Sequence, residues 1–409
     1  MTQSTTRTST RTFNTGAAAW LILVLLLLFS VAAPLNQFKI PPIMSVIMDA
    51  LGISVSSAGL LMSVFAITGL ILALPSGFIL QRFGFKVTGL LAGGSIVLGA
   101  VLGALSRDMN VLLASRVIEG VGTSLVAVLA PAIIARWFGA EKRGAAMGVW
   151  SAWVPLGTII MLIVAPALAQ SSGWQSVWWA GAAYAAVTTA LYLLFVRPAP
   201  AAPASAEPEA GARAADAPAD GGLGRVLRNR NVWLLSATFA AFNASLIGFS
   251  SYLPTFLAAE HGLGLTQAAL VAGIPTFLTL ISAPVGGAIS DRIRSRKKPF
   301  LIGLVCSAVL VSLAGLTGFA LLIAVLVAIG LVLGVIPTTI FSAAVEATGD
   351  VRLGGMAMAV VMVGQNAGML LGPMIVGALA ESSGWPLAFI SAGAMALVGV
   401  IVGGLVKVR

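Results

Sequence analysis

A short basic turn between two long apolar stretches constrains this chain most. It runs from Gly287 through Asp291 and Arg292 to Lys298, and an apolar stretch lies on each side of it. An apolar stretch of about twenty residues spans a lipid bilayer as a helix. Basic residues in the turn hold it on the cytoplasmic side of the membrane. The stretch therefore predicts two membrane-spanning helices joined by a tight cytoplasmic turn.

The same pattern occurs 210 residues earlier, from Gly77 to Lys86. The earlier copy keeps Gly84 where the later copy has Arg294, and it has Gln81 in place of Asp291. Both turns resemble the loop signature of the major facilitator superfamily, Gly-x-x-x-Asp-Arg-x-Gly-x-Arg-Arg. Two copies at this separation imply two homologous halves, and the resemblance implies six helices in each half.

Composition agrees with a membrane protein. The 409 residues are 59% hydrophobic and 9% charged, whereas globular domains average roughly 25% charged residues. The length leaves room for about a dozen spans of membrane length. We expect spans near residues 16–40, 56–80, 87–106, 110–135, 144–169, 175–196, 231–258, 266–290, 300–318, 320–346, 353–380 and 385–406.

These features predict an all-α polytopic membrane protein whose twelve transmembrane helices form two pseudo-symmetric six-helix bundles. The first bundle covers residues 16–197 and the second residues 231–409. Residues 1–15 form a polar cytoplasmic leader, which lacks the cleavage pattern of a signal peptide. Residues 198–230 are largely rich in alanine and proline and cannot bury a core, so we expect a disordered cytoplasmic linker.

The basic residues predict the orientation. With these spans, all of the 23 lysines and arginines except Lys39, Arg107 and Arg116 fall on one side. This asymmetry places both termini in the cytoplasm. It also accounts for the formal charge of +10 through topology and contact with anionic lipid, so no nucleic-acid partner is expected.

Several kinds of chemistry are excluded by residue counts. Cys306 and His261 are the single cysteine and the single histidine, so neither a disulfide within the chain nor a Cys/His metal site can form. No nucleophile–base pair near a cavity is evident. We expect neither an enzyme nor a cofactor.

The fourth span carries two charged residues. Its sequence, Arg116-Val-Ile-Glu119-Gly120-Val-Gly122, resembles the fourth-helix motif of the superfamily, Arg-x-x-Gln-Gly-x-Gly, with Glu119 in place of glutamine. Residues three apart share a helix face and can pair. Glu119 can carry a proton, because burial favours the neutral form of a carboxyl group. Alternatively, Arg116 keeps Glu119 ionised and the pair only fastens the helix.

Lys39 is the leading candidate for contact with a ligand. It follows Asn36 and Gln37 in the proline-rich outer half of the first span, a helix that lines the central cavity in this superfamily. A lysine in the cavity would bind an anionic group as a point charge. Alternatively, Lys39 lies at the outer membrane interface with its ammonium in water.

The remaining candidate residues fall into two groups. Expected further substrate contacts are Asn36, Gln37, Tyr252, Trp153, Gln365 and Asn366, with packing as the alternative for Trp153. The resemblance implies gating by the two basic turns, through Gly77, Arg82, Gly287, Asp291 and Arg292, in which Asp291 and Arg292 latch the cytoplasmic face. Glu346 is expected to join this gate through Arg352 or Arg136.

The resemblance implies a secondary transporter of the bacterial inner membrane that works by alternating access. With Lys39 as the one cationic cavity candidate, we expect a small monovalent anion that moves with a proton. Proton-coupled export of hydrophobic drugs is the alternative within transport, and a non-transporting membrane sensor is the alternative outside it. The expected partners are the small solute, an ion gradient and membrane lipids, with the chain acting as a monomer.

Overall fold

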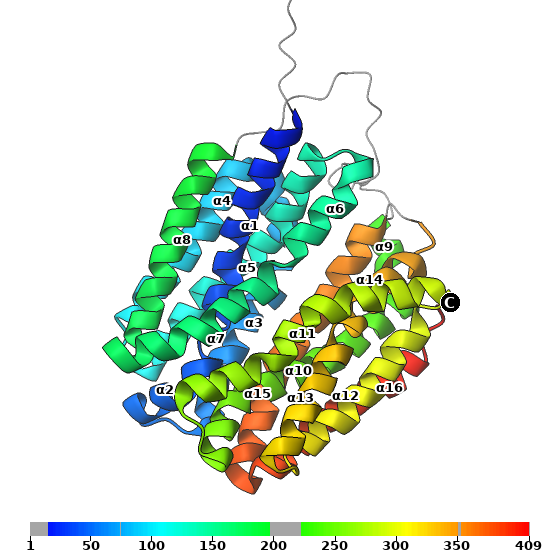
Figure 1. Cartoon of the computed structure of the whole chain (residues 1–409). Coiled ribbons are helices and arrows are strands. Elements are labelled where there is room, and N and C mark those ends of the chain that lie inside the picture. The colour runs from blue at the N-terminus through cyan, green and yellow to red at the C-terminus, as the bar shows by residue number, and fades with distance from the viewer. Residues whose placement is uncertain (1–14, 74, 197–221, 351–352, 409) are drawn as a thin grey trace, which may run out of the picture.

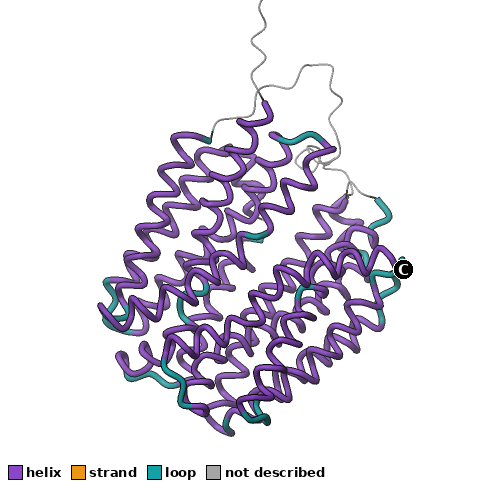
Figure 2. Tube along the Cα trace, in the orientation of Figure 1, coloured by secondary structure: helices purple, strands orange, loops and turns teal. Residues whose placement is uncertain are grey.

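Every regular element of the described chain is helical. The computed structural model describes residues 15–73, 75–196, 222–350 and 353–408. In this part, twelve helical segments are long and apolar enough to cross a membrane (Figure 1), and no strand occurs (Figure 2). The predicted all-α, twelve-span fold is confirmed. Residues 1–14 of the leader and residues 198–221 of the linker lie outside the described residues, so the disorder of that part of the linker stays a prediction.

The elements follow the chain in two series. The first consists of α1 (Thr15–Gln37), η1 (Pro41–Ile43), α2 (Met44–Leu51), α3 (Val55–Leu72), α4 (Pro75–Ala104), α5 (Met109–Trp137), α6 (Ala140–Ser151), α7 (Trp153–Ser172) and α8 (Gln175–Phe195). The second consists of α9 (Gly222–Leu227), α10 (Arg230–His261), α11 (Leu265–Arg292), α12 (Lys297–Ala314), α13 (Phe319–Leu333), α14 (Val335–Ala347), α15 (Gly354–Ser383) and α16 (Trp385–Gly404). The short helix α9 lies within the predicted linker, so that part is helical.

Two of the twelve spans are each divided between two of the helices named above. The fifth span breaks between α6 and α7, and the tenth breaks between α13 and α14. A proline, Pro155 or Pro337, occupies the third position of the second piece in both cases. Proline has no N–H to donate to the carbonyl four residues earlier, so the hydrogen-bond ladder is interrupted at each break.

The two series form two groups of helices, coloured blue to green and green to red in Figure 1. In the first, α4 packs on α5 and α8, and α1 packs on α5, α7 and α8. In the second, α10 packs on α15 and α16, and α11 packs on α13. The groups meet chiefly where α3 contacts α15 and where α7 contacts α11.

We name the ends of the molecule by what they carry. The α2 end carries η1 and α2, and the linker end carries the start of α1 together with α9. At the α2 end, η1 contacts α10 and α11. At the linker end the helices of the two groups diverge (Figure 1). The two groups of helices are therefore held together mainly at the α2 end.

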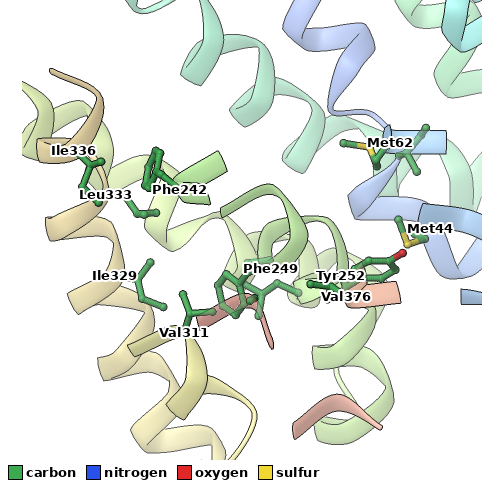
Figure 3. Packing of buried hydrophobic residues seen from close by; sticks show 14 of the residues in the cluster. Met44, Met62, Phe242, Phe249, Tyr252, Val311, Ile329, Leu333, Ile336 and Val376 are labelled. Carbon is green, nitrogen blue, oxygen red and sulfur yellow. The ribbon is translucent and has the colours of Figure 1, made fainter. Parts of the chain in front are cut away.

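Apolar packing joins the elements within and between the groups. Figure 3 shows the second group, where Phe242 and Phe249 of α10 face the side chains of α12, α13 and α14. Tyr252 and Val376 lie farther along, toward Met44 of α2. All five side chains belong to one continuous buried cluster, so the core does not stop at the boundary between the halves.

The repeated basic turn contains a residue with positive φ in both halves. Gly84, with φ +71° and ψ 179°, separates two helical pieces within α4. Arg294, 210 residues later, has φ +51° and is the one non-glycine residue with positive φ among the described residues. Glycine adopts positive φ without a steric penalty, whereas a residue with a Cβ does not. The second copy of the turn therefore also has positive φ at this position, but without a glycine.

Candidate functional site

The broken end of α1 is held by Arg116 of α5. The helix ends at Gln37, and Pro41 and Pro42 follow within η1. The last carbonyls of a helix lack an intrahelical donor, and Arg116 supplies donors here. Its Nη1 donates to the Asn36 carbonyl at 2.7 Å and its Nη2 to the Gln37 carbonyl at 2.8 Å. The guanidinium therefore ties α1 to α5.

Arg116 also contacts α3 and Glu119. Its Nε donates to the Leu61 carbonyl at 3.2 Å, and its Nη1 donates to the Glu119 carboxylate. The guanidinium carbon lies 4.6 Å from the centre of the Phe65 ring. The predicted pairing of Arg116 with Glu119 on one helix face is confirmed.

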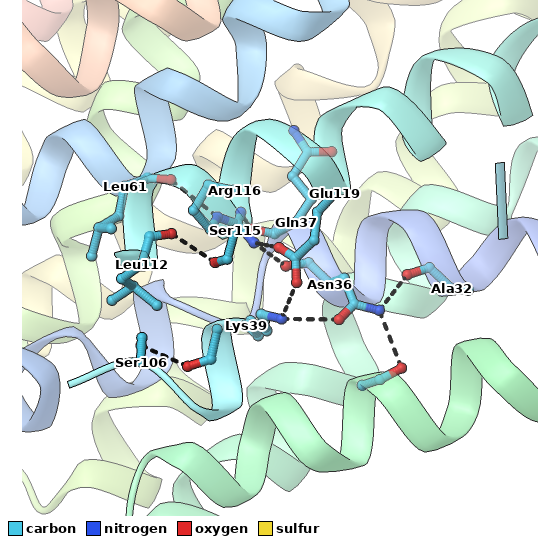
Figure 4. Close-up of polar contacts among 12 residues, drawn as sticks. Ala32, Asn36, Gln37, Lys39, Leu61, Ser106, Leu112, Ser115, Arg116 and Glu119 are labelled. Carbon is cyan, nitrogen blue, oxygen red and sulfur yellow. Dashed lines mark hydrogen bonds and ion pairs between the residues drawn. The ribbon is translucent and has the colours of Figure 1, made fainter. Parts of the chain in front are cut away.

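Lys39 is the second partner of Glu119. Its Nζ lies 2.6 Å from Glu119 Oε1 and 3.0 Å from Asn36 Oδ1, as Figure 4 shows. The side chains of Lys39, Arg116 and Glu119 are fully buried. In this conformation the Lys39 ammonium is not in water, and the side chain does not line an open cavity wall. It is enclosed in the first group of helices.

Lys39, Arg116 and Glu119 form what we call the charged triad. With all three ionised, it carries two positive charges and one negative charge. An unpaired charge in a membrane costs at least about 2.5 kcal/mol, and burial makes the loss of either partner of Glu119 more costly still. The triad thus holds one excess positive charge in a water-excluded position.

Asn366, one of the two predicted contacts on α15, lies against the first group. Asn366 Nδ2 donates to the Met362 carbonyl at 2.9 Å, and a Cβ on Gly69 of α3 would lie 2.1 Å from Asn366 Oδ1. Gln365 is partly buried.

Trp153 stacks on Trp150 with ring centres 5.2 Å apart, which is the packing role considered as its alternative.

Tyr252 lies at the α2 end, between the groups. Its hydroxyl is within hydrogen-bond distance of the Val55 carbonyl of α3, at 3.2 Å, and of the Pro373 carbonyl of α15, at 3.0 Å. Close by, the Ser56 N–H in the first turn of α3 donates to Glu381 Oε2 of α15 at 3.0 Å. The structure therefore places Tyr252 at a contact between the two groups that closes this end.

The two acidic gating residues share one partner, Arg296. Arg296 Nη1 donates to Asp291 Oδ1 at 2.5 Å, and Arg296 Nε donates to Glu346 Oε1 at 2.8 Å. Arg292 is exposed. Asp291 therefore pairs with an arginine of its own turn, and Glu346 pairs with Arg296 rather than Arg136. Arg352, the other expected partner, lies outside the described residues. The latch formed by Asp291 and Arg292 stays a prediction.

The remaining gating residues face open space. Gly77 and Gly287 have no atom within 4 Å of an added Cβ, and Arg82 is exposed.

Hydrogen bonds to Glu346 and Asp291 raise the pKa of the Arg296 guanidinium, so the bridge formed by Arg296 keeps its positive charge at physiological pH. Which end of the molecule these residues gate, and when, stays a prediction.

Three features of the site were not found from the sequence. Trp178 lies beside Lys39, Arg296 bridges two acidic residues, and Glu381 meets the start of α3. Arg296 is one of five basic residues in its turn, and the sequence pattern does not distinguish among them. An acidic residue in the last turn of the eleventh span was the one available signal for Glu381.

Comparison with known proteins identifies the family. The model of the Major Facilitator Superfamily matches residues 26–354 and 257–409. The chain is 26% identical to the "Hexuronate transporter" of Bacillus subtilis (strain 168) over 382 residues, which cover 90% of this chain and 87% of that protein. It is 24% identical over 388 residues to the "Probable sulfoacetate transporter" of Cupriavidus necator, with 91% and 87% covered.

A solved structure has the same fold. The crystal structure of a bacterial homologue of the human lysosomal transporter Spinster, in an inward-facing and unoccupied conformation, matches with a TM-score of 0.79. It is 16% identical in sequence and covers 95% of this chain and 97% of that chain. Because the family model spans most of the sequence and the helices form the expected two groups, this chain belongs to the Major Facilitator Superfamily and is a transporter, not an enzyme.

Proposed function

We propose that the protein moves a small monovalent organic anion together with protons across the bacterial inner membrane by alternating access. The observation that carries this proposal is the charged triad, which holds one excess positive charge inside the first bundle. In the described spans of the second bundle, charged residues lie in the first or last turn of their helices. A single excess positive charge suits a substrate with a single negative charge.

Glu119 is the proposed proton carrier. A proton on its carboxylate removes the negative charge that holds Lys39, while Arg116 remains bound to the carbonyls of Asn36 and Gln37. The Lys39 ammonium then lacks a counter-ion in a buried position, where an unpaired charge is costly. A substrate carboxylate or sulfonate supplies that counter-ion, so uptake of the proton and binding of the anion favour each other.

The relatives support an organic anion as substrate. Two relatives that align along about nine-tenths of the chain are named for transport of hexuronate and of sulfoacetate. Alternating access is supported by the way the bundles meet, because α3 joins α15 at the α2 end while the helices diverge at the linker end. The distribution of basic residues favours a cytoplasmic linker end. In the conformation described, the proposed carrier is thus closed toward the outside.

Binding and proton movement are tested together. Purified protein is screened by thermal shift at pH 5.5 and 7.5 against small carboxylates, sulfonates, neutral sugars and lipophilic cations. A ligand at a hundred times its dissociation constant stabilises by about 2.7 kcal/mol. Active anions are then added to proteoliposomes that contain a pH-sensitive dye, and entry of the anion should acidify the lumen.

Two variants connect the result to the triad. Lys39→Ala should abolish both the thermal shift and the dye response, whereas Lys298→Ala, at an exposed lysine, should preserve them. Wild-type anion binding by Lys39→Ala would show that the triad only fastens α1 to α5. Stabilisation by lipophilic cations alone would instead support drug export.

A further inference from the structure

The Lys39 ammonium has three neighbours that account for its three N–H groups. They are Glu119 Oε1 at 2.6 Å, Asn36 Oδ1 at 3.0 Å, and the face of the Trp178 ring, whose centre is 4.4 Å from Nζ. A lysine ammonium has three donors and no acceptor. A cation over an indole face is attracted by the ring quadrupole. For an anion to bind Lys39, one of these three neighbours must give way.

Asn36 is fixed in place by its own hydrogen bonds. Its Nδ2 donates to the Ala32 carbonyl at 2.9 Å and to the Gly181 carbonyl at 3.4 Å. This orientation directs the Asn36 oxygen at Lys39. A Cβ at Gly181 would lie 2.3 Å from that oxygen, so the close approach of α8 to α1 depends on a glycine. Asn36 has no charge to lose and little room to move.

Trp178 is fixed by packing. The side chain is fully buried and meets Trp174 edge to face, with ring centres 5.1 Å apart and an interplanar angle of 84°. A Cβ at Gly103 would lie 2.3 Å from both Cδ1 and Nε1 of the indole. Trp178 and Gly181 are three residues apart, so they share the face of α8 that meets Lys39 and Asn36.

The indole N–H gives independent evidence of what orients this ring. Trp178 Nε1 is buried and has no hydrogen-bond acceptor among the described residues. No hydrogen bond to the described residues therefore orients the ring. The ring keeps this orientation although an unsatisfied buried donor is unfavourable. Its orientation presents the aromatic face to Lys39 instead. Contact with the ammonium is the polar interaction that this side chain makes.

We propose that Trp178, together with Asn36, is a positioning residue that keeps the Lys39 ammonium in place when Glu119 is protonated, so that the substrate oxyanion takes the place of the Glu119 carboxylate. This inference rests on the proposed function. Of the three neighbours, Glu119 alone can be neutralised by a proton. The proton therefore binds before the anion.

The surroundings of Glu119 agree with this assignment. The charged groups that face it are Lys39 and Arg116. Helices α3 and α8 contain no charged residue, and those of α4, Arg82 and Lys86, lie near the turn at Gly84 at the linker end. The Tyr184 and Tyr192 hydroxyls of α8 donate elsewhere, to the carbonyls of Leu28 and Phe85. Removal of Trp178 should thus weaken the hold on the Lys39 ammonium without changing the number of charges in the site.

The test compares anion uptake by Trp178→Leu, Trp178→Phe and the wild type across a range of pH. Loss of a buried cation–π contact should raise the apparent KM of Trp178→Leu by about 2- to 30-fold, with the maximal rate little changed. Phenylalanine should restore part of the affinity. Because Glu119 then binds its proton less readily, the pH profile should move to more acid values. Trp179→Leu, at an exposed neighbour, is the matched control.

A double-mutant cycle separates positioning from packing. The thermal stability lost in Trp178→Leu should be smaller in a Lys39→Met/Glu119→Gln background, which has no ammonium for the ring to hold. Equal losses in the two backgrounds, with an unchanged KM and pH profile, would overturn the inference. If Lys39→Ala still abolishes anion binding in that case, the proposed function stands. Wild-type binding by Lys39→Ala would reject the proposed site itself.

Discussion

We expect closure of the α2 end to depend on the Tyr252 hydroxyl and on Gly59, whose missing side chain leaves room for that hydroxyl. The hydroxyl lies between the carbonyls of Val55 on α3 and Pro373 on α15. A hydrogen bond of this kind contributes about 0.5–1.5 kcal/mol, which corresponds to a factor of about 2 to 12 in an equilibrium. Tyr252→Phe should therefore shift the population by that factor toward conformations in which the α2 end is open.

Gly59→Ala should have a larger effect. An added Cβ would lie 2.0 Å from the Tyr252 hydroxyl oxygen and 2.9 Å from the Pro373 carbonyl oxygen. Neither distance is compatible with the closed contact, so α3 and α15 must separate. Combining Gly59→Ala with Tyr252→Phe removes the shorter clash and should restore part of the closed population. Gly94→Ala, where an added Cβ meets no atom within 4 Å, is the control.

The assay is a spin-label distance measurement across the α2 end. Labels are placed at Asp49 of α2 and Glu260 of α10, which are both exposed, after Cys306 is replaced by serine. Gly59→Ala should increase the fraction of long distances relative to the wild type and to Gly94→Ala. If the distance distributions of the two glycine variants coincide, this contact does not control closure.

Three further predictions concern the triad and the turns. Glu119→Gln should abolish accumulation driven by a pH gradient yet preserve counterflow, because an amide resembles the protonated acid but cannot release a proton; loss of both in transport assays would indicate a structural role. Because φ is positive at both positions, Gly84→Ala should lower the free energy of unfolding by about 1–3 kcal/mol, whereas Arg294→Gly should not lower it. Chemical denaturation in detergent compares the two variants. Arg296→Ala should cost about 1 kcal/mol or less, because its partners are 68% and 44% exposed; an effect that persists undiminished at high salt would contradict an electrostatic origin.

Much of the architecture follows from local features of the sequence. The length of the apolar runs determines the number of spans, because a helix needs a certain length to cross a bilayer. The repeat of the basic turn reveals the two halves and extends to backbone geometry at Gly84 and Arg294. The pairing of Arg116 with Glu119 follows from helix periodicity alone. Each of these inferences depends on residues close together in the chain.

The partners of Lys39, Tyr252 and Glu346 were decided by the tertiary structure. Glu119 is 80 residues from Lys39, and the carbonyl of Val55 is 197 residues from Tyr252. A helix in a soluble protein shows by its apolar stripe which face turns inward, but lipid is as apolar as the protein interior, so membrane helices are apolar on most faces. The sequence therefore determines that these helices exist and how long they are. The rotation of each helix about its axis, and hence which polar side chains meet, depends on how the twelve spans pack.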